Sequence, residues 1–328
     1  MLGFVLRRLG HAGAVLAGVH LLTFALFFTL HTPDDMARQN LGSKRLTEVQ
    51  VVQWKAARGY DRPLWHNDQR TGAAQLTDTV FWLRTASLLQ GDFGPPDAQG
   101  AGDIGDELRQ RMAVSLALAG PVVVGLLGMS TLLAAGLAWA RHTRAEAWGL
   151  ALCGVLLAVS TLFVLVFGQA VVAGVWRLAP ASGFVPGGEG VRFLVLPVVL
   201  AVLARLGGEV RFQRAALLEA LDSAPVRAAQ ARGLSAARVM GQCVLRQALV
   251  PILTSVGNSV PTVVLGSVVV EQFFGLPGLG AYVVDAIAAQ DFAVVRSLVW
   301  VGAVLVVGTN ALVDLACAWA DPRVGRSP

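Results

Sequence analysis

Four long uncharged runs divide the chain. They are Leu9–Leu30, Ala113–Ala140, Ala147–Trp176 and Gln247–Val270. Each is longer than the roughly 20 residues that an α-helix needs to cross the hydrocarbon core of a bilayer. Each run therefore predicts a transmembrane helix.

Two weaker runs complete the pattern. Phe193–Ala204 has 12 uncharged residues between Arg192 and Arg205, and Ser297–Val313 follows a single arginine. Arginine side chains at the ends of a span can reach the interface, so both runs predict transmembrane helices. The predicted fold is an all-α polytopic membrane protein with six transmembrane helices. Composition agrees, because 14% of the residues are charged against about 25% in soluble domains.

The first run could also be a signal peptide, because Arg7 and Arg8 precede it. It is longer than the usual apolar region of about 7–15 residues, and the segment after it lacks a convincing small-x-small cleavage site. An uncleaved membrane anchor is the expected interpretation.

Basic residues predict the orientation of the chain. If the N-terminus is cytoplasmic, thirteen arginines lie inside: Arg7, Arg8, Arg141, Arg144, the seven from Arg205 to Arg246, Arg323 and Arg326. The short outside loops hold Arg177, Arg192 and Arg296. This bias places both termini in the cytoplasm, and the long segment after the first run does not count. The isoelectric point of 9.7 then reflects orientation, so it calls for no nucleic-acid partner.

The expected organisation has three parts. Residues 1–30 form the cytoplasmic N-terminus and first helix, 31–112 a large extracytoplasmic segment, and 113–328 a core of five transmembrane helices. Within 31–112, Thr47 and Gln50 form a capping pattern, and Gly59 stops a short helix, Glu48–Arg58. The segment "GDFGPPDAQGAGDIG" is rich in turn residues. Both a folded cap on the outer mouth and a solvated insertion fit this composition.

An arginine-bearing stretch interrupts the apolar pattern between residues 205 and 248. Pro225 suits the first turn of a short helix, Val226–Arg232, and Gly233 ends it. Ser235 then caps a second helix that runs toward Pro251. The pattern predicts a rigid elbow on the cytoplasmic face. Its arginines fit either anionic lipid headgroups or a docking surface for a protein.

The chain lacks the patterns of an enzyme or an ion-driven carrier. Its two lysines, Lys44 and Lys55, do not lie in a phosphate-binding G-x-x-x-x-G-K-[ST] loop, and H-E-x-x-H and G-x-S-x-G are absent. The predicted spans have no acidic residue in their middle and no evident inverted repeat, which disfavours a secondary transporter. We expect no catalytic residue and no cofactor in this chain.

No metal site is predicted either. Cys153, Cys243 and Cys317 are far apart, and no span holds a His/Cys/Asp cluster with ligand spacing. His20 lies near the middle of the first span, where a role in helix packing is favoured over a nickel or proton site.

Six motifs occur in an order that resembles one family. They are "MLGFVLRRL", "YDRPLW", "GDFG", Glu219-Ala220 followed by "AAQARGLS", "VEQFFGLPGLG" (Val270–Gly280), and "ALVDLACAWADPRVG" at the end. This series resembles the permease subunits of ABC importers, in the dipeptide, oligopeptide and nickel branch. The resemblance covers nearly the whole chain, and it implies the type I importer fold with six transmembrane helices.

The resemblance also implies site residues. The elbow resembles the EAA loop, which couples a permease to its ATPase, and the matching positions are Glu219, Ala220, Asp222, Arg227, Ala231, Arg232, Gly233, Leu234 and Pro251. Candidates for a gate or outer mouth are Glu271, Phe274, Pro277, Gly278 and Gly280. The C-terminal family motif comprises Asp314, Asp321, Pro322 and Arg323. Glu271 and Asp314 are expected to shape the gate or cap helices rather than to bind cargo.

The partners implied are a second permease subunit, two ATPase subunits that bind ATP and magnesium, an extracytoplasmic solute-binding protein, and membrane lipid. The implied role is half of a translocation pathway for peptides or related small solutes in a bacterial inner membrane. Two departures lie in the outer segment: Pro33-Asp34-Asp35-Met36 replaces the usual P-G-D-P, and Pro95-Pro96 follow "GDFG". They leave open the details of docking and a non-peptide cargo such as nickel or a metal chelate. The direction of transport rests on the resemblance alone.

Overall fold

The computed structural model describes residues 2–42, 47–98, 102–185, 187, 190–265 and 267–320. Over these residues the chain folds into helices joined by turns, without a β-strand. The all-α prediction is therefore confirmed. Asp321, Pro322 and Arg323 of the predicted C-terminal motif lie outside the described residues.

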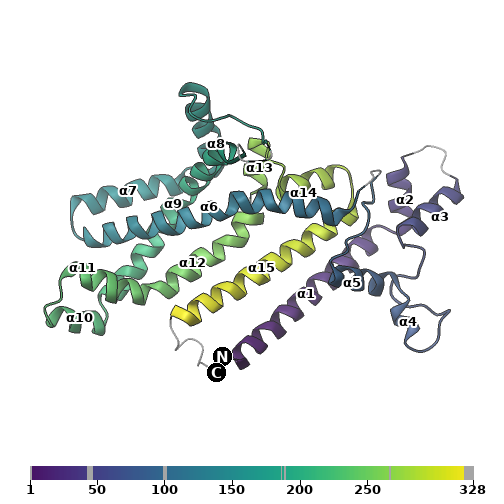
Figure 1. Cartoon of the computed structure of the whole chain (residues 1–328), viewed down its shortest axis with the longest axis horizontal. Coiled ribbons are helices and arrows are strands. Elements are labelled where there is room, and N and C mark those ends of the chain that lie inside the picture. The colour runs from purple at the N-terminus through teal and green to yellow at the C-terminus, as the bar shows by residue number, and fades with distance from the viewer. Residues whose placement is uncertain are drawn as a thin grey trace. The chain divides into compact units, whose positions relative to one another are not determined.

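Among the described residues, five spans are long and apolar enough to cross a membrane. The helices that form them are α1 (Leu2–Leu30), α6 (Ile104–Trp139), α9 (Gly190–Leu221), α12 (Leu245–Leu265) and α15 (Phe292–Ala320) (Figure 1). The fifth span begins before α12 and covers Ala236–Pro261. A bent helix pair counts as a sixth span if its two arms are taken together, which agrees with the six predicted helices.

The run Ala147–Trp176, predicted as one helix, is broken. Its first arm is α7 (Arg144–Ala158), and its second is α8 (Thr161–Gln169), which continues as the π-helical turn η1 (Ala170–Val175). The arms meet at 95°, because the backbone is extended at both Val159 (ψ 130°) and Ser160 (ψ 138°). A β-branched residue followed by Ser and Thr favours a helix start over a helix interior.

The run Phe193–Ala204 lies inside a much longer helix. α9 continues for 32 residues through Arg205 and Glu209, a rise of about 48 Å. Charged side chains did not end the helix, because they keep good helix propensity. The uncharged run thus marked only part of this element.

The structure separates into two compact units. Unit 1 comprises residues 1–5, 114–280 and 308–328, and unit 2 comprises 6–113 and 281–307.

In unit 1, α9 packs along α7 and α12 (Figure 1). A buried cluster on α6, α7, α9 and α12 includes Ala134, Cys153, Val210 and Ile252. α7 and α9 approach closely at Gly207, where a Cβ atom would lie 2.5 Å from the Cys153 carbonyl oxygen. The lack of a side chain at residue 207 therefore sets this packing distance.

The N-terminal part of unit 2 contains the shorter helices α2 (Pro33–Leu41), α3 (Glu48–Ala57), α4 (Ala74–Thr77) and α5 (Val80–Gln90). Buried side chains of α2, α3 and α5 pack with Phe24 and Phe28 of α1 in a core that includes Met36, Trp54 and Tyr60, and α4 has no buried residue. The predicted helix Glu48–Arg58 is confirmed apart from its last residue. This core favours a folded segment over a solvated insertion.

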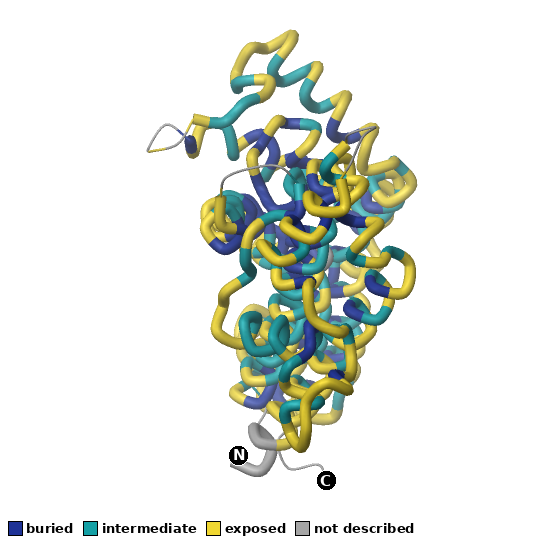
Figure 2. Tube along the Cα trace, turned by 90° about the vertical axis from the view of Figure 1, so that its right-hand side faces the viewer, coloured by how far each residue is buried: buried dark blue, intermediate teal, exposed yellow. Residues whose placement is uncertain are grey.

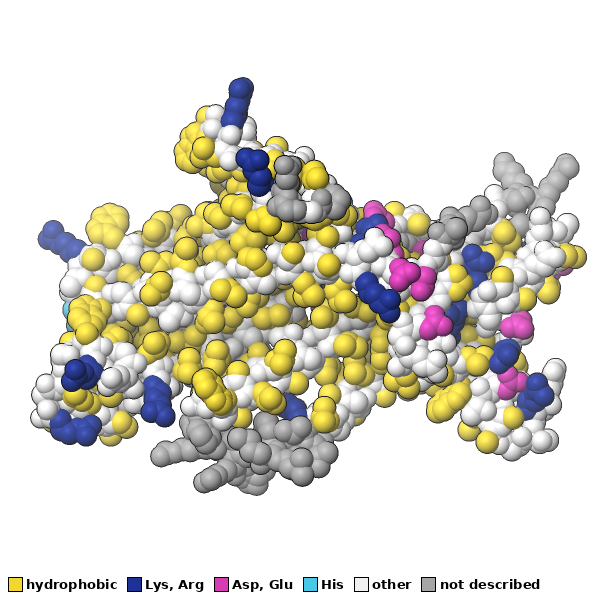
Figure 3. Space-filling view, in the orientation of Figure 1, with side chains coloured by type: hydrophobic (Ala, Val, Ile, Leu, Met, Phe, Trp, Pro, Cys, Tyr) yellow, Lys and Arg dark blue, Asp and Glu magenta, His cyan; other side chains and the backbone are white. Residues whose placement is uncertain are grey.

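The long helices leave much apolar surface outside these cores. Figure 2 shows buried positions as short stretches between exposed ones, and in Figure 3 hydrophobic side chains cover the long helices. Leu132, Trp148 and Leu312 are each more than 70% exposed. Contiguous exposed apolar surface is typical of contact with lipid or another subunit.

Candidate functional site

The predicted elbow joins α9 to α12. It consists of α10 (Ala224–Ala231), a turn, the single turn α11 (Ala236–Arg238) and the π-helical turn η2 (Val239–Val244), shown in green in Figure 1. Pro225 lies in the first turn of α10, as its fixed φ favours. The short helix predicted over Val226–Arg232 is therefore present, with its start two residues earlier and its end one residue earlier.

One face of α10 is anchored in the core of unit 1. Val226 and Ala229 are both fully buried, and they pack in one cluster with Leu217 of α9 and with Val239 and Val244 of η2. A helix of eight residues is too short to be stable alone in water. Tertiary contacts through these two side chains therefore hold α10 in place.

The opposite face of α10 is exposed. Arg227, Gln230 and Ala231 project from it, and Arg232 follows in the turn. Arginine side chains cluster at this end of unit 1 in Figure 3. Glu219, near the end of α9, is exposed as well. The elbow thus presents a polar, arginine-bearing surface on a braced scaffold.

The turn after α10 requires glycine for its backbone. Gly233 has φ +77°, and its N–H donates to the carbonyl oxygen of Gln230 at 2.9 Å. No atom lies within 4 Å of a Cβ built at this position. The requirement is therefore conformational rather than one of space.

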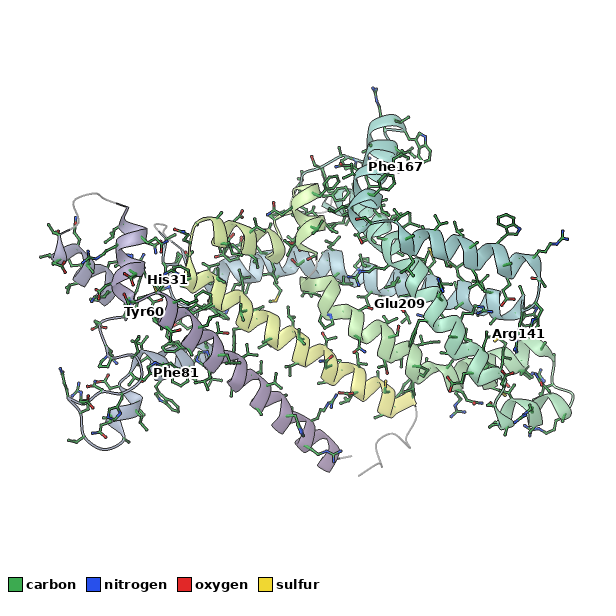
Figure 4. The ribbon with its side chains drawn as sticks, turned by 180° about the vertical axis from the view of Figure 1, so that it is seen from behind. His31, Tyr60, Phe81, Arg141, Phe167 and Glu209 are labelled. Atoms are coloured by element: carbon green, nitrogen blue, oxygen red, sulfur yellow. The ribbon has the colours of Figure 1, made fainter. Side chains whose placement is uncertain are left out.

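The remaining elbow candidates have different surroundings. Ala220 is buried and Leu234 is half-buried, and both belong to or pack against the core cluster of unit 1. Asp222 forms an ion pair with Arg141 at 3.4 Å, which ties the elbow to the connection between α6 and α7 (Figure 4). Pro251 lies inside α12, beyond the elbow helices. The structure brings the loop residues together and leaves Pro251 apart from them.

The outer-mouth candidates surround a buried carboxylate. Glu271, on α13 (Val268–Phe274), is fully buried, and its Oε1 accepts hydrogen bonds from Ser115 and Ser267, each at 2.7 Å. The Ser115 hydroxyl in turn accepts the backbone N–H of Leu279 at 2.7 Å. Glu271 therefore links α13, α6 and the start of α14 (Leu279–Ala288).

Close backbone approach surrounds this carboxylate. A Cβ atom at Gly278 would lie 2.3 Å from the Glu271 carboxyl carbon, and one at Gly280 would lie 2.5 Å from the Cα of Val268. Phe274 is buried and Pro277 is exposed. The contacts of Glu271 position these residues, and a gating role for them stays a prediction. Asp314 lies half-buried on α15.

One acidic residue within a span was missed in the sequence. Glu209 lies on α9 beyond the predicted span Phe193–Ala204, and it accepts hydrogen bonds from Ser255 at 2.6 Å and Ser259 at 3.2 Å. Both serines lie near the middle of the uncharged run Gln247–Val270. The two serines are four residues apart, which places them on one face of a helix. This spacing could have indicated a polar partner on a neighbouring helix.

In unit 2 a buried polar network ties the segment between α1 and α6 to α15. The Tyr60 hydroxyl donates to Asp97 at 3.1 Å and accepts from Arg296, while Asp97 also accepts the N–H of Ala293 at 2.9 Å. Burial raises the pKa of both Tyr60 and Asp97. The phenol therefore remains protonated and able to donate.

His20 packs in the same unit. Its Nε2 lies 2.8 Å from the Thr85 hydroxyl, its ring stacks on Phe81 at 5.3 Å, and it meets Trp300 edge-on. These contacts agree with the favoured packing role. Across the described residues, no three His, Cys, Asp or Glu side chains gather as a metal site.

Comparison with known proteins agrees with this architecture. Residues 111–326 match the family described as "Binding-protein-dependent transport system inner membrane component". The chain is 30% identical to the di/tripeptide transport system permease protein DppB of Pseudomonas aeruginosa, over 99% of both chains. It is 28% identical to the dipeptide transport system permease protein DppB of Lactococcus lactis, over 99% of both.

Similarity extends to a second group of permeases. The chain is 31% identical to the oligopeptide transport system permease protein OppB of Haemophilus influenzae, over 74% of this chain and 79% of that protein. The family match covers well over half of the chain, and it includes the elbow and the segment around Glu271. The chain therefore belongs to the binding-protein-dependent inner membrane permeases of ABC importers, in the branch of the dipeptide and oligopeptide permeases.

Proposed function

We propose that this permease forms half of the translocation pathway for peptides or related small solutes, and that α10 receives the motion of a cytoplasmic ATPase subunit. The cargo class is drawn from the names of the relatives, which are permeases of dipeptide and oligopeptide transport systems. A non-peptide cargo remains the alternative within the same family.

The division of α10 into two faces carries the proposal. Val226 and Ala229 fasten the helix to unit 1, while Arg227, Ala231 and Arg232 remain exposed. A lipid-facing amphipathic helix would place apolar residues on its outer face. The outer face of α10 instead carries arginines and small side chains, which favours a groove on a protein.

Contacts at both ends of α10 allow the elbow to transmit a displacement to the long helices. α10 packs against η2, and η2 leads directly into α12, while α9 enters from the other side. A displacement of α10 must therefore move the ends of α9 and α12 together. Such coupled motion could alternate access to a pathway lined by these helices.

The proposed assembly has a second permease, two ATPase subunits and an extracytoplasmic binding protein. The chain lacks a phosphate-binding loop of its own, so the ATPase subunits bind ATP and magnesium. We place both termini and the elbow in the cytoplasm on the distribution of arginines.

Purification of the tagged chain in mild detergent tests the proposal, with mass spectrometry of what accompanies it. We expect a second permease and P-loop ATPases. Arg227→Glu combined with Arg232→Glu should lower ATPase recovery at least about fivefold, since each reversal places an acid against a surface suited to arginine. Recovery of the second permease should not change.

Arg177→Glu is the matched control, because Arg177 is also exposed but lies after η1, outside the elbow. It should leave ATPase recovery unchanged. Full ATPase recovery with the double reversal would contradict docking through α10 and favour contact of these arginines with lipid.

A further inference from the structure

Glu209 lines an open hollow in unit 1. The hollow has a volume of about 550 Å³ and lies between α9 and α12, where Phe212, Pro251, Thr254 and Asn258 also line it. Figure 4 labels Glu209 where these two helices run side by side. The walls are mostly apolar, and the carboxylate provides the charged group.

The carboxylate is held in one position. Ser255 donates to Oε2 at 2.6 Å, while the single hydroxyl proton of Ser259 is shared between Oε1 and the carbonyl oxygen of Ser255. The bond to that carbonyl oxygen keeps the two hydroxyls on the same helix face. Each carboxylate oxygen still has lone-pair capacity for a further donor.

The charge of Glu209 is not neutralised by a close ion pair. Arg205, one turn away on the same helix, interacts electrostatically with Glu209, but within the part of the chain that the structure describes the two form no ion pair within 4.0 Å. Glu209 lies on α9, a helix long and apolar enough to cross a membrane, and acids within such helices commonly line substrate or ion paths. A hollow with mostly apolar walls and a few placed polar groups, here Glu209, Thr254 and Asn258, is also typical of a small-ligand site.

We propose that Glu209 binds the ammonium group of a solute as it passes through the permease. A primary ammonium carries three donors and a compact positive charge, which match a fixed carboxylate with free lone pairs. The proposal rests on the proposed transport function and names a residue of the pathway. It applies to the amino terminus of a peptide as to any cationic small solute.

A cysteine in the hollow tests the charge directly. In the assembled transporter, with Cys153, Cys243 and Cys317 replaced by alanine, Asn258→Cys is treated with a cationic aminoethyl or an anionic sulfonatoethyl methanethiosulfonate. The cationic reagent should react faster. Glu209→Gln should lower the ratio of the two rates about tenfold, which corresponds to about 1.4 kcal/mol.

Two further variants separate charge from structure. Ser255→Ala with Ser259→Ala keeps the charge but frees the carboxylate, so the rate ratio should stay high. Glu48→Gln removes an exposed acid of unit 2 and should change nothing. An unchanged ratio in Glu209→Gln would overturn the proposal, as would no reaction of Asn258→Cys with either reagent.

A second measurement distinguishes the role of Glu209 from the proposed transport function. The assembled transporter is reconstituted in proteoliposomes, and solute uptake is measured. With Ala-Ala as solute, Glu209→Gln should reduce ATP-driven uptake at least about fivefold, while recovery of the partner subunits stays normal. Loss of the second permease from Glu209→Gln would assign Glu209 to the subunit interface and overturn the proposal. Absence of ATP-driven uptake by the unaltered transporter would instead refute the transport function and leave the thiol result standing.

Discussion

At the residue scale, Tyr60 shows how one hydroxyl can hold two charged side chains in a buried place. It donates to Asp97 and accepts from Arg296, and all three side chains belong to unit 2. Removing the hydroxyl leaves a buried carboxylate and a guanidinium each with one partner fewer. The cost of leaving such groups incompletely bonded exceeds the value of the hydrogen bond itself.

We therefore expect Tyr60→Phe to destabilise the protein by about 1–3 kcal/mol, measured as a fall in the melting temperature of the purified chain in detergent. Tyr282→Phe is the control, because the Tyr282 ring receives the Arg111 guanidinium on its face and keeps that contact as Phe. A loss in Tyr60→Phe no larger than in Tyr282→Phe would show that the network adds little stability.

At the element scale, the packing of α7 on α9 depends on one of two adjacent glycines. A Cβ at Gly207 would meet the backbone of α7, at 2.5 Å from the Cys153 oxygen and 3.2 Å from the Leu157 nitrogen. Its neighbour Gly208 has room, since the nearest atom lies 3.5 Å away in a side chain. Backbone atoms cannot rotate away as a side chain can. A side chain at residue 207 would therefore force α7 and α9 apart.

Gly207→Ala should therefore destabilise the protein by about 1–3 kcal/mol through overpacking. Gly208→Ala should leave stability unchanged or improve it by up to about 1 kcal/mol, because alanine favours the helix. Thermal unfolding of the two variants in the same detergent compares them. Equal melting temperatures would contradict the close approach of α7 and α9.

Most elements could be predicted from the sequence, because uncharged runs longer than a bilayer have few alternatives to helix. Two features of the predicted spans could not. The break at Val159 and Ser160 lies inside an uncharged run, and hydropathy cannot register a change in backbone angle. The extension of α9 past Arg205 has the opposite cause, since charge marks the edge of the apolar run but not the end of a helix.

Only part of the candidate site could be predicted, because local sequence patterns report backbone requirements but not contacts between distant residues. Gly233 was recognisable because a helix stop needs a left-handed residue, and Pro225 because it suits a first turn. Glu209 was missed because its partners, Ser255 and Ser259, are distant in sequence. The burial of Glu271 depends on Ser115, Ser267 and the glycines around it, which no single motif reports.

At the scale of the whole molecule, the elbow joins a small surface to two long helices. Gly233→Pro should leave insertion intact, since the apolar spans are unchanged, but disrupt the turn. Proline fixes φ near −65° where Gly233 has +77°, and it removes the N–H that bonds to Gln230. We expect uptake per ATP hydrolysed to fall at least about tenfold in the reconstituted transporter.

Gly233→Asn is the matched variant, because asparagine tolerates the left-handed region and the space around this Cβ position is open. Its uptake per ATP should stay within about twofold of the unaltered protein. Normal uptake per ATP hydrolysed in Gly233→Pro would show that the turn at Gly233 is not needed to couple ATP hydrolysis to transport.

The division of α10 has a consequence for how such permeases diverge. Its hold on the fold depends on Val226 and Ala229, while Arg227, Ala231 and Arg232 contribute little to folding. Mutations on the outer face can therefore accumulate without loss of the folded protein. A duplicated copy of this chain could acquire a different ATPase through a few surface changes, and its inherited scaffold would remain intact.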